Sequence, residues 1–278
     1  MLAFNRYVND LVIYILIKES FYKKYHVIFD SFLRTYTLYD KKLDSCYNEN
    51  NYFCYICENM NEYEFVNKSE NNYCTICDTH NENWIFTLLN YMESFYADIL
   101  KCTVIHGSCI SINGKNILFT GERKTGKTTI TYFLANNMNG VYLDDDCIYI
   151  IKNGYIGFGM PMPIRHDTGL HNNNSNKKIF IAQTTDDEGV KRLLYLPKEI
   201  IDCCEKIDVV VFPKFDKNST NSIKKMQQTE AFQALLKNVR NYSDMKAIIS
   251  DIKKLISIAD CIKITYSSSE SAYNLLCE

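Results

Sequence analysis

The sequence predicts a mixed α/β fold (α/β with α+β features), in which a phosphate-binding core follows a smaller β-rich N-terminal region. Three observations support this class. A glycine-containing phosphate-loop pattern lies at residues 121–128, Asn-Gly hairpin signals recur after residue 101, and short β-like segments separated by polar turns precede residue 80. With 278 residues and 46% hydrophobic content, the chain is long enough to bury a sizeable core in one or two domains.

Residues 121–128 match the pattern G-x-x-x-x-G-K-[ST] completely. An apolar strand-like run at 116–120 precedes the loop, and helical apolar spacing at 129–136 follows it. A strand, loop and helix in this order direct backbone N–H groups and a helix N-terminus at phosphate oxygens. Lys127 is then expected to reach the β- and γ-phosphates, and the Thr128 hydroxyl to meet Mg²⁺. The predicted nucleotide-binding residues are Gly121, Glu122, Arg123, Lys124, Thr125, Gly126, Lys127, Thr128 and Thr129.

The remaining elements of the C-terminal part follow from local patterns. Asn-Gly pairs at 113–114 and 153–154 are typical of two-residue hairpin turns. Apolar runs predict strands, and apolar spacing near 3.6 residues predicts helices. We expect strands at 102–112, 115–120, 140–143, 148–151, 155–158, 207–212 (ending at Pro213) and 261–266, and helices at 129–136, 229–236 and 244–259.

The N-terminal part has a different character. Residues 1–45 are apolar and aromatic, which predicts strands and a short helix. Short β-like pieces at 52–57, 63–67 and 73–77 alternate with Asn- and Glu-rich turns, which predicts an antiparallel meander. Helical periodicity at 82–99 predicts a linker helix. We therefore expect two domains, 1–100 and 101–278, with substrate recognition as a hypothesis for the first.

Asp144, Asp145 and Asp146 end an apolar strand about 20 residues after the loop. A phosphate-binding loop needs a carboxylate opposite it to organise Mg²⁺. A divalent cation relieves the repulsion among adjacent carboxylates and leaves one of them available as a base. The alternative is a polar turn that caps the strand. Because side chains alternate along a strand, Asp144 and Asp146 share one face, and the pattern leaves open which face meets the nucleotide.

Composition limits the other functional classes. The net charge of −2 gives no electrostatic reason to expect a nucleic-acid partner. The apolar run at 11–17 is too short to span a membrane and lacks the features of a signal peptide. The 12 cysteines are then expected to be mostly reduced thiols in a cytoplasmic protein without a membrane partner.

The segment 104–121, the loop, and the segment 143–150 together resemble the HPr kinase/phosphorylase family and its smaller kinase relatives. The His-Gly at 106–107 before a hairpin, the hairpin leading into the loop, and the Asp-Asp-x-hydrophobic segment carry the resemblance, which extends over about residues 100–270. It implies a P-loop core similar to that shared with PEP carboxykinase, and an ATP- and Mg²⁺-dependent kinase acting on a hydroxyl of a peptide or protein.

By resemblance, Asp145 is similar to the family's catalytic carboxylate, which takes the proton of the acceptor hydroxyl. Asp146 is similar to its neighbour near the metal, together with Thr128, and His106 is similar to the active-site histidine near the transferred phosphoryl group. The predicted catalytic residues are thus Asp145, His106 and Lys127. The family's glycine-rich signature is absent, and residues 157–163 stand in its place. The chain is therefore closer to the relatives that phosphorylate a peptide serine.

Two cysteine pairs, Cys54 with Cys57 and Cys74 with Cys77, have the C-x₂-C spacing of zinc sites. The residues within each pair favour strands, however, and a strand directs positions i and i+3 to opposite faces. We expect buried free thiols, with a zinc site as the alternative.

The acceptor class is also open. A Ser/Thr kinase for a peptide or protein is the first hypothesis. A small-molecule kinase, for example for an amino acid, and a nucleotide-binding switch or adaptor without catalysis are the alternatives. The Asp run and His106 favour catalysis, because a switch needs no base for a hydroxyl. The sequence leaves the preferred nucleotide and homo-oligomerisation open.

Overall fold

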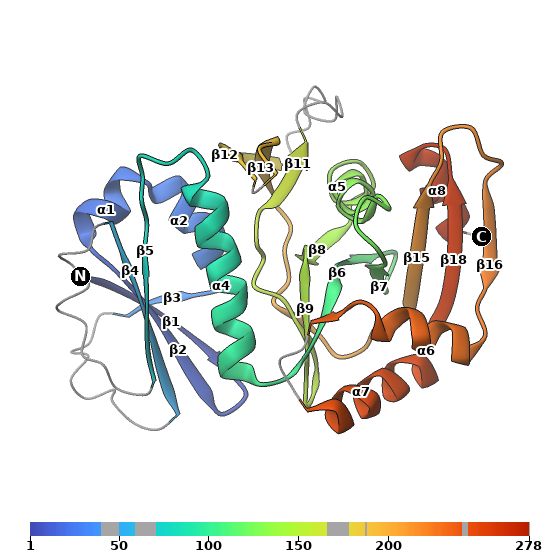
Figure 1. Cartoon of the computed structure of the whole chain (residues 1–278), viewed down its shortest axis with the longest axis horizontal. Coiled ribbons are helices and arrows are strands. Elements are labelled where there is room, and N and C mark those ends of the chain that lie inside the picture. Colours follow the sequence, from blue (N-terminus) through green and yellow to red (C-terminus); the bar gives the residue numbers. More distant parts are fainter. Residues whose placement is uncertain (40–49, 59–70, 166–177, 187, 241–243, 278) are drawn as a thin grey trace. The chain divides into compact units, whose positions relative to one another are not determined.

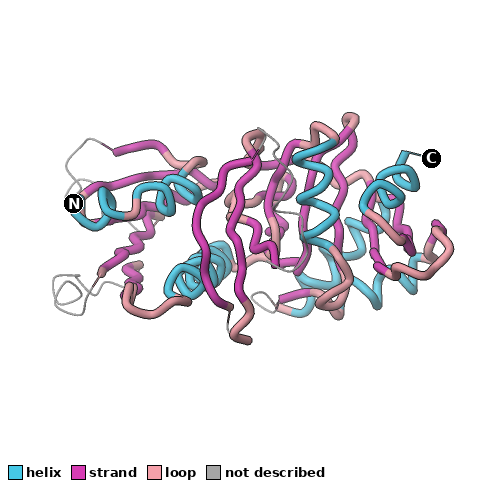
Figure 2. The backbone as a smooth tube through the Cα atoms, turned by 90° about the horizontal axis from the view of Figure 1, so that it is seen from above, coloured by secondary structure: helices cyan, strands magenta, loops and turns pink. Residues whose placement is uncertain are grey.

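The structure is a computed structural model that describes residues 1–39, 50–58, 71–165, 178–186, 188–240 and 244–277. Helices and strands are mixed along the whole chain, which confirms the mixed α/β class (Figure 2). The chain divides into two compact units. One unit contains Met1–Ile99 and Ile181–Leu193, and the other contains Leu100–Phe180 and Leu194–Glu278. The domain boundary at residue 100 stays a prediction.

The first unit is built on a five-stranded sheet in the order β3-β1-β2-β4-β5. Strands β1 and β2 form an antiparallel hairpin, and α4 buries Leu88, Met92 and Phe95. This helix confirms the helix expected at 82–99. The elements are β1 (Leu2–Val8), β2 (Leu11–Ile17), α1 (Glu19–Lys24), α2 (His26–Leu33), β3 (Thr37–Tyr39), β4 (Asn51–Cys57), β5 (Asn72–Ile76) and α4 (Trp84–Leu100) (Figure 1).

The antiparallel meander expected in this region is wrong. Strand β4 pairs in parallel with both β2 and β5. Parallel neighbours need a long crossover connection, whereas the meander prediction treated the polar segments as tight turns. Alternation of polar and apolar residues reports burial but carries no information on strand direction. The strand expected at 63–67 lies outside the described residues.

The second unit contains the main sheet, with strand order β14-β10-β9-β6-β7-β15-β18-β16, and β8 and β17 also pair with β6. Strands β7, β15 and β18 are mutually parallel. Figure 1 shows β15, β18 and β16 side by side. The elements are β6 (Thr103–Ile112), β7 (Lys115–Thr120), α5 (Lys127–Asn137), β8 (Val141–Asp144), β9 (Cys147–Ile151), β10 (Gly154–Ile156), β14 (Cys203–Cys204), β15 (Val209–Phe215), β16 (Ser222–Lys225), α6 (Gln228–Leu236), β17 (Val239–Arg240), α7 (Met245–Ile258), β18 (Asp260–Tyr266) and α8 (Ser269–Cys277).

Helices cover both faces of this sheet. Leu118 and Val210 pack with α6 and α7 in one hydrophobic cluster. Phe119 and Val211, the next residues along the same strands, pack with α5 and α8 in a second cluster. This alternation is the period of two that a doubly covered sheet requires. The cores therefore hold the carboxyl ends of β7, β15 and β18 at one edge of the sheet, where the phosphate loop begins.

Two local predictions need correction. Strand β15 does not end at Pro213, because this residue continues the pairing with β18 opposite Ile264. The pairing with β7 runs only as far as Val211, so β15 has lost this neighbour at Pro213, and proline is found at such edge positions. The second hairpin turns at residues 152–153 rather than at 153–154, and Gly154 already pairs with Ile151.

A third sheet has three strands in the order β11-β13-β12. No helix in the described ranges combines the length and the apolarity that a membrane span requires. The strands of the small sheet are β11 (Met162–Arg165), β12 (Lys178–Thr185) and β13 (Lys191–Pro197).

Candidate active site

The phosphate loop connects the end of β7 to the start of α5, as the sequence predicts. The antiparallel pair β6 and β7 turns at Asn113 and Gly114, which both have positive φ. Lys127 is the first residue of α5, and its Nζ donates hydrogen bonds of 2.9 Å to the carbonyl oxygens of Gly121 and Glu122. Burial lowers the Lys127 pKa below its usual value. A positive charge at the helix N-terminus is thus enclosed by the loop that would receive phosphate.

Gly126 is required where the loop enters the helix. Its φ is 99°, and a Cβ atom there would lie 2.1 Å from the Tyr266 hydroxyl oxygen. Tyr266 ends β18, and its hydroxyl lies 3.5 and 3.4 Å from the carbonyl oxygens of Thr125 and Gly126. The second glycine of the motif therefore serves both the left-handed turn and a close approach from a neighbouring strand.

Asp145 faces the phosphate loop. The Thr128 hydroxyl is 3.3 Å from Asp145 Oδ1, and Asp145 is only 4% exposed. Burial, reinforced by the adjacent Asp146 charge, raises the Asp145 pKa to about 7. The Thr128 hydrogen bond and the electrostatic effects of His106 and Lys127 oppose that rise. A carboxyl group that titrates near neutral pH beside a phosphate loop is suited to proton transfer.

Asp146 points elsewhere, to His106 and Arg240. Its φ of 79° places it in the left-handed region, which Asp tolerates better than most residues. Its two carboxylate oxygens lie 2.6 Å from His106 Nδ1 and 2.9 Å from an Arg240 guanidinium nitrogen. Burial alone raises the Asp146 pKa, but the His106 hydrogen bond and the Arg240 charge bring it well below its usual value. Asp146 is thus a stable anion held by two basic groups.

Asp144 is bound to backbone N–H groups instead of to side chains of the site. It is 1% exposed and accepts backbone N–H groups from Asp145 (2.9 Å), Phe158 (2.6 Å) and Met160 (3.0 Å). Burial raises its pKa to about 7, although these N–H donors lower it. A Cβ atom on Gly157 would lie 2.6 Å from the Asp144 Cβ, so the segment packs closely against the carboxylate. Asp144 therefore fixes the 157–160 backbone.

The predicted catalytic residues come together around the loop. Asp145 contacts Thr128, and His106 contacts Asp146. Of the predicted loop residues, Glu122, Arg123 and Lys124 are exposed. Of the three adjacent carboxylates, Asp145 is the one that contacts the phosphate loop. Asp146 does not share a face with Asp144, because the chain turns at Asp146 instead of continuing the strand. The assignment of Asp146 and Thr128 to the metal, and of Asp145 to the base, stays a prediction.

Sequence reasoning missed Arg240 and Tyr266. Arg240 is remote from Asp146 in sequence and reaches it because β17 pairs with β6. No local motif indicates this contact. Tyr266 ends a predicted strand, and the small residue at position 126 is the only local hint that another strand approaches there.

The oxygen atoms of Thr128 and Asp145 are of the kind that a magnesium ion prefers. Mg²⁺ prefers carboxylate, hydroxyl and phosphate oxygens and usually takes only one or two protein ligands in phosphate sites. Among the ion pairs of the described residues, Asp146 has two close basic partners, whereas the buried Asp145 carboxylate has none as close. A cation would offset the cost of its burial.

The four cysteines lie on β4 and immediately around β5. Cys57 Sγ is 3.7 Å from Cys74 Sγ, and both thiols are free. Cys57 packs in one hydrophobic cluster with Phe53 and Tyr55, whereas Cys54 is outside that cluster, as alternation along the strand predicts. Within the described ranges, no group of three or more Cys, His, Asp or Glu residues is arranged to hold a metal ion. Metal analysis of the purified protein remains the test of the zinc alternative.

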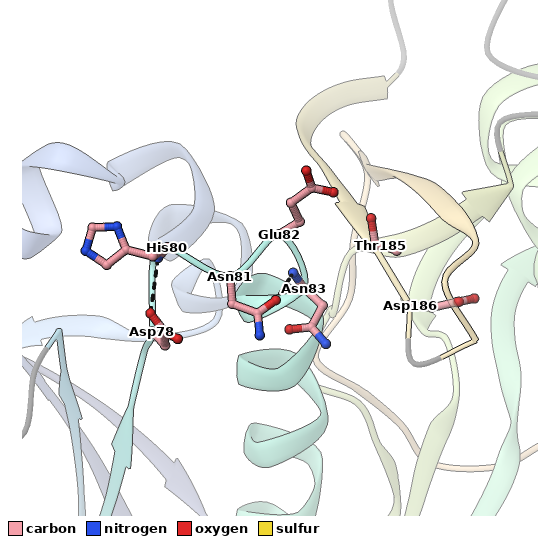
Figure 3. A pocket seen from close by; sticks show the side chains of 7 residues that line it. All are labelled: Asp78, His80, Asn81, Glu82, Asn83, Thr185 and Asp186. Atoms are coloured by element: carbon pink, nitrogen blue, oxygen red, sulfur yellow. Dashed lines mark hydrogen bonds between the residues drawn. The ribbon is translucent and has the colours of Figure 1, made fainter.

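A second concave region lies within the first unit. It is an open polar cavity of about 570 Å³ between the turn before α4 and the end of β12. Figure 3 shows the His80 ring pointing away from Asp186, and Asp78 accepts the His80 backbone N–H at 3.2 Å. Asp186 pairs instead with Arg192 at 2.6 Å. The titratable groups therefore do not converge on one point.

Known proteins give little information on the identity of this site. No family model and no curated protein matches the chain. Among solved structures, the chain is similar to the Hpr(Ser) kinase/phosphatase from Coxiella burnetii, with 13% identity and a TM-score of 0.30. That match covers 63% of this chain and 93% of the other. A likeness this low establishes neither a shared fold nor an activity.

Proposed function

We propose that the protein is an ATP-dependent kinase that transfers the γ-phosphoryl group to a Ser or Thr hydroxyl of a peptide or protein. The observation that carries this proposal is the contact between the phosphate loop and a buried carboxylate. Thr128 is the second residue of α5, and its hydroxyl lies 3.3 Å from Asp145 Oδ1. Phosphoryl transfer needs positioned charges and a base for the hydroxyl more than it needs covalent chemistry.

Each side chain has a defined task in this proposal. The loop N–H groups and Lys127 hold the phosphates, and Asp145 orients the acceptor hydroxyl and accepts its proton. His106 and Arg240 hold Asp146 as an anion next to Asp145, and its charge helps to keep the Asp145 pKa near 7. A base with this pKa is half ionised near neutral pH, where proton transfer is most effective.

Bound Mg²⁺ would be held by Thr128 with Asp145 or Asp146, and it would neutralise charge on the phosphates. Asp145 is already beside Thr128, whereas Asp146 is bound to His106 and Arg240. The two candidate metal neighbours are separable by experiment. Replacement of the carboxylate that neighbours the metal should raise the Mg²⁺ concentration needed for half-maximal ATP binding, and replacement of the other should leave it unchanged.

Incubation with ATP labelled at the γ-phosphate and with Ser- or Thr-containing peptides tests the activity. The wild-type protein should transfer label to the hydroxyl, and Lys127→Ala should lose transfer because the phosphates lose their central cation. Lys198→Ala, at an exposed lysine outside the loop, is the matched control and should behave as wild type. Retained transfer by a folded Lys127→Ala protein would contradict the proposed role of the loop.

The identity of the acceptor separates the proposed activity from its alternatives. Transfer to a free amino acid in place of a peptide would support the small-molecule alternative. Slow hydrolysis of ATP without transfer to any acceptor would support the nucleotide-dependent switch. Acceptor recognition by residues 1–100 and a cytoplasmic location are parts of the proposal that rest on sequence composition.

A further inference from the structure

The two sides of the phosphate loop differ in chemistry. Asp145 follows β8, which pairs with β6 on one side of β7, whereas β15 and β18 lie on the other side. Strands β7, β15 and β18 are parallel, so their carboxyl ends lie at the same edge as the loop. A nucleotide whose γ-phosphoryl group faces Asp145 therefore extends its other end toward the ends of β15 and β18.

An aromatic side chain stands at that position. Phe215 is the last residue of β15 and is 50% exposed. It shares a strand face with Val211, which packs against α5, because the two positions are four residues apart. A Cβ atom on Gly126 would lie 3.6 Å from the Phe215 Cβ. The base of this half-exposed side chain is thus a direct neighbour of the phosphate loop.

The backbone that carries this ring is firmly held. Phe215 pairs with Tyr266 in the parallel ladder, and their ring centroids are 5.7 Å apart at an interplanar angle of 60°. Tyr266 is 1% exposed and contacts the loop carbonyls through its hydroxyl. The Asp216 N–H donates to the Tyr266 carbonyl oxygen at 3.0 Å. The Phe215 ring is therefore in contact with Tyr266, while half of the side chain stays accessible to solvent.

We propose that Phe215 is the platform on which the nucleobase of the bound nucleoside triphosphate stacks. A flat apolar ring beside an anion site is complementary to a base that is joined to phosphates. A phenyl ring has no hydrogen-bonding group, so this contact supplies affinity without selecting one purine over another. This inference rests on the nucleotide site of the proposed function and adds the position of the base.

The test compares two ligands that share phosphates and differ in the base: ATP and inorganic tripolyphosphate, both with Mg²⁺, measured by isothermal titration calorimetry. Phe215→Ala should weaken ATP binding by about 5- to 150-fold, the range expected for one lost base–aromatic stack. Its affinity for tripolyphosphate should not change. Phe215→Trp should retain ATP affinity, because a larger ring keeps the stack.

Two further variants separate stacking from packing. Phe215→Leu keeps apolar bulk against Tyr266 but removes the flat ring, so it should lose ATP affinity as Phe215→Ala does. Ile258→Ala, at an apolar side chain that is 54% exposed on α7, should bind both ligands as wild type does. ATP affinity that is unchanged in Phe215→Ala would overturn the proposal, and so would an equal loss of both ligands, which would indicate that Phe215 only supports the loop. Wild-type protein that binds neither ligand would overturn the nucleotide site itself.

Discussion

Asp144 and Asp145 are adjacent residues of the same type, but their carboxylates have different hydrogen-bond partners and different expected roles. Both side chains are buried, and burial raises both pKa values to about 7. Asp144 is satisfied by three backbone N–H groups, so its function is to hold residues 157–160. Asp145 has one side-chain contact of 3.3 Å, to Thr128, and faces the phosphate loop. The comparison shows that hydrogen-bond partners, and not burial, separate the structural carboxylate from the catalytic candidate.

The largest expected effect is on catalysis at Asp145. Asp145→Asn keeps the size and the Thr128 contact but removes the base, so phosphoryl transfer should fall by about 10³-fold. ATP binding should persist, because the loop is unchanged. Transfer rates with labelled ATP and binding by calorimetry check the two halves of this prediction. Asp144→Asn serves as the matched variant and should retain transfer per folded molecule.

The next effect is on stability at Asp144. Asp144→Ala leaves three backbone donors without their acceptor, which should destabilise the fold by about 3 kcal/mol or more at roughly 1 kcal/mol or more per buried donor. Asp144→Asn keeps one acceptor oxygen and should lose less. Urea unfolding measures both. Wild-type stability in Asp144→Ala would show that the 157–160 backbone does not depend on this carboxylate.

A pH-dependent effect sharpens the comparison. Because the Asp145 pKa rises from its ordinary value to about 7 on folding, the folded state binds its proton more tightly than the unfolded state does. This contribution to stability is full below about pH 4 and is lost as the pH rises through 7. The stability advantage of Asp145→Asn over wild type should therefore grow by up to about 3 kcal/mol between pH 5 and pH 8. Urea unfolding of the nucleotide-free proteins at both pH values tests this, and a pH-independent difference would contradict the raised pKa.

The smallest effect concerns Arg240, a positioning residue that acts through Asp146. Arg240→Gln removes one of the two basic partners of Asp146. It should lower kcat by about 10-fold, because Asp146 and the adjacent Asp145 are then less well aligned. The KM for ATP should stay constant, because Arg240 binds Asp146 and Cys147, which lie outside the phosphate loop. Arg240→Lys should recover part of the rate. A rise in KM with unchanged kcat would instead indicate a role in nucleotide binding.

The sequence predicts the parts of the site that local patterns encode. The strand, loop and helix around residues 121–128 and the turn at 113–114 depend on neighbouring residues, and the structure contains them. The parallel pairing of β4 and β5 depends on long connections, so a local pattern does not contain it. The contacts of Asp146 with Arg240 arise from strand pairing between distant segments.

The same distinction applies within the Asp run. Three adjacent carboxylates predict an acidic strand end, but their separate tasks depend on the 157–160 backbone, on Thr128 and on His106. The alternation rule assumes a continuing strand. The strand ends at Asp144, and the left-handed conformation of Asp146 redirects its carboxylate. Faces deduced from alternation therefore hold only as far as the strand extends.

The most direct test of the central claim is a single-turnover measurement of γ-phosphoryl transfer from labelled ATP to a Ser- or Thr-containing acceptor peptide, with wild type and Asp145→Asn side by side. The account predicts transfer by wild type and, for the variant, ATP binding with transfer lower by about 10³-fold. Transfer by folded Asp145→Asn at the wild-type rate would contradict it.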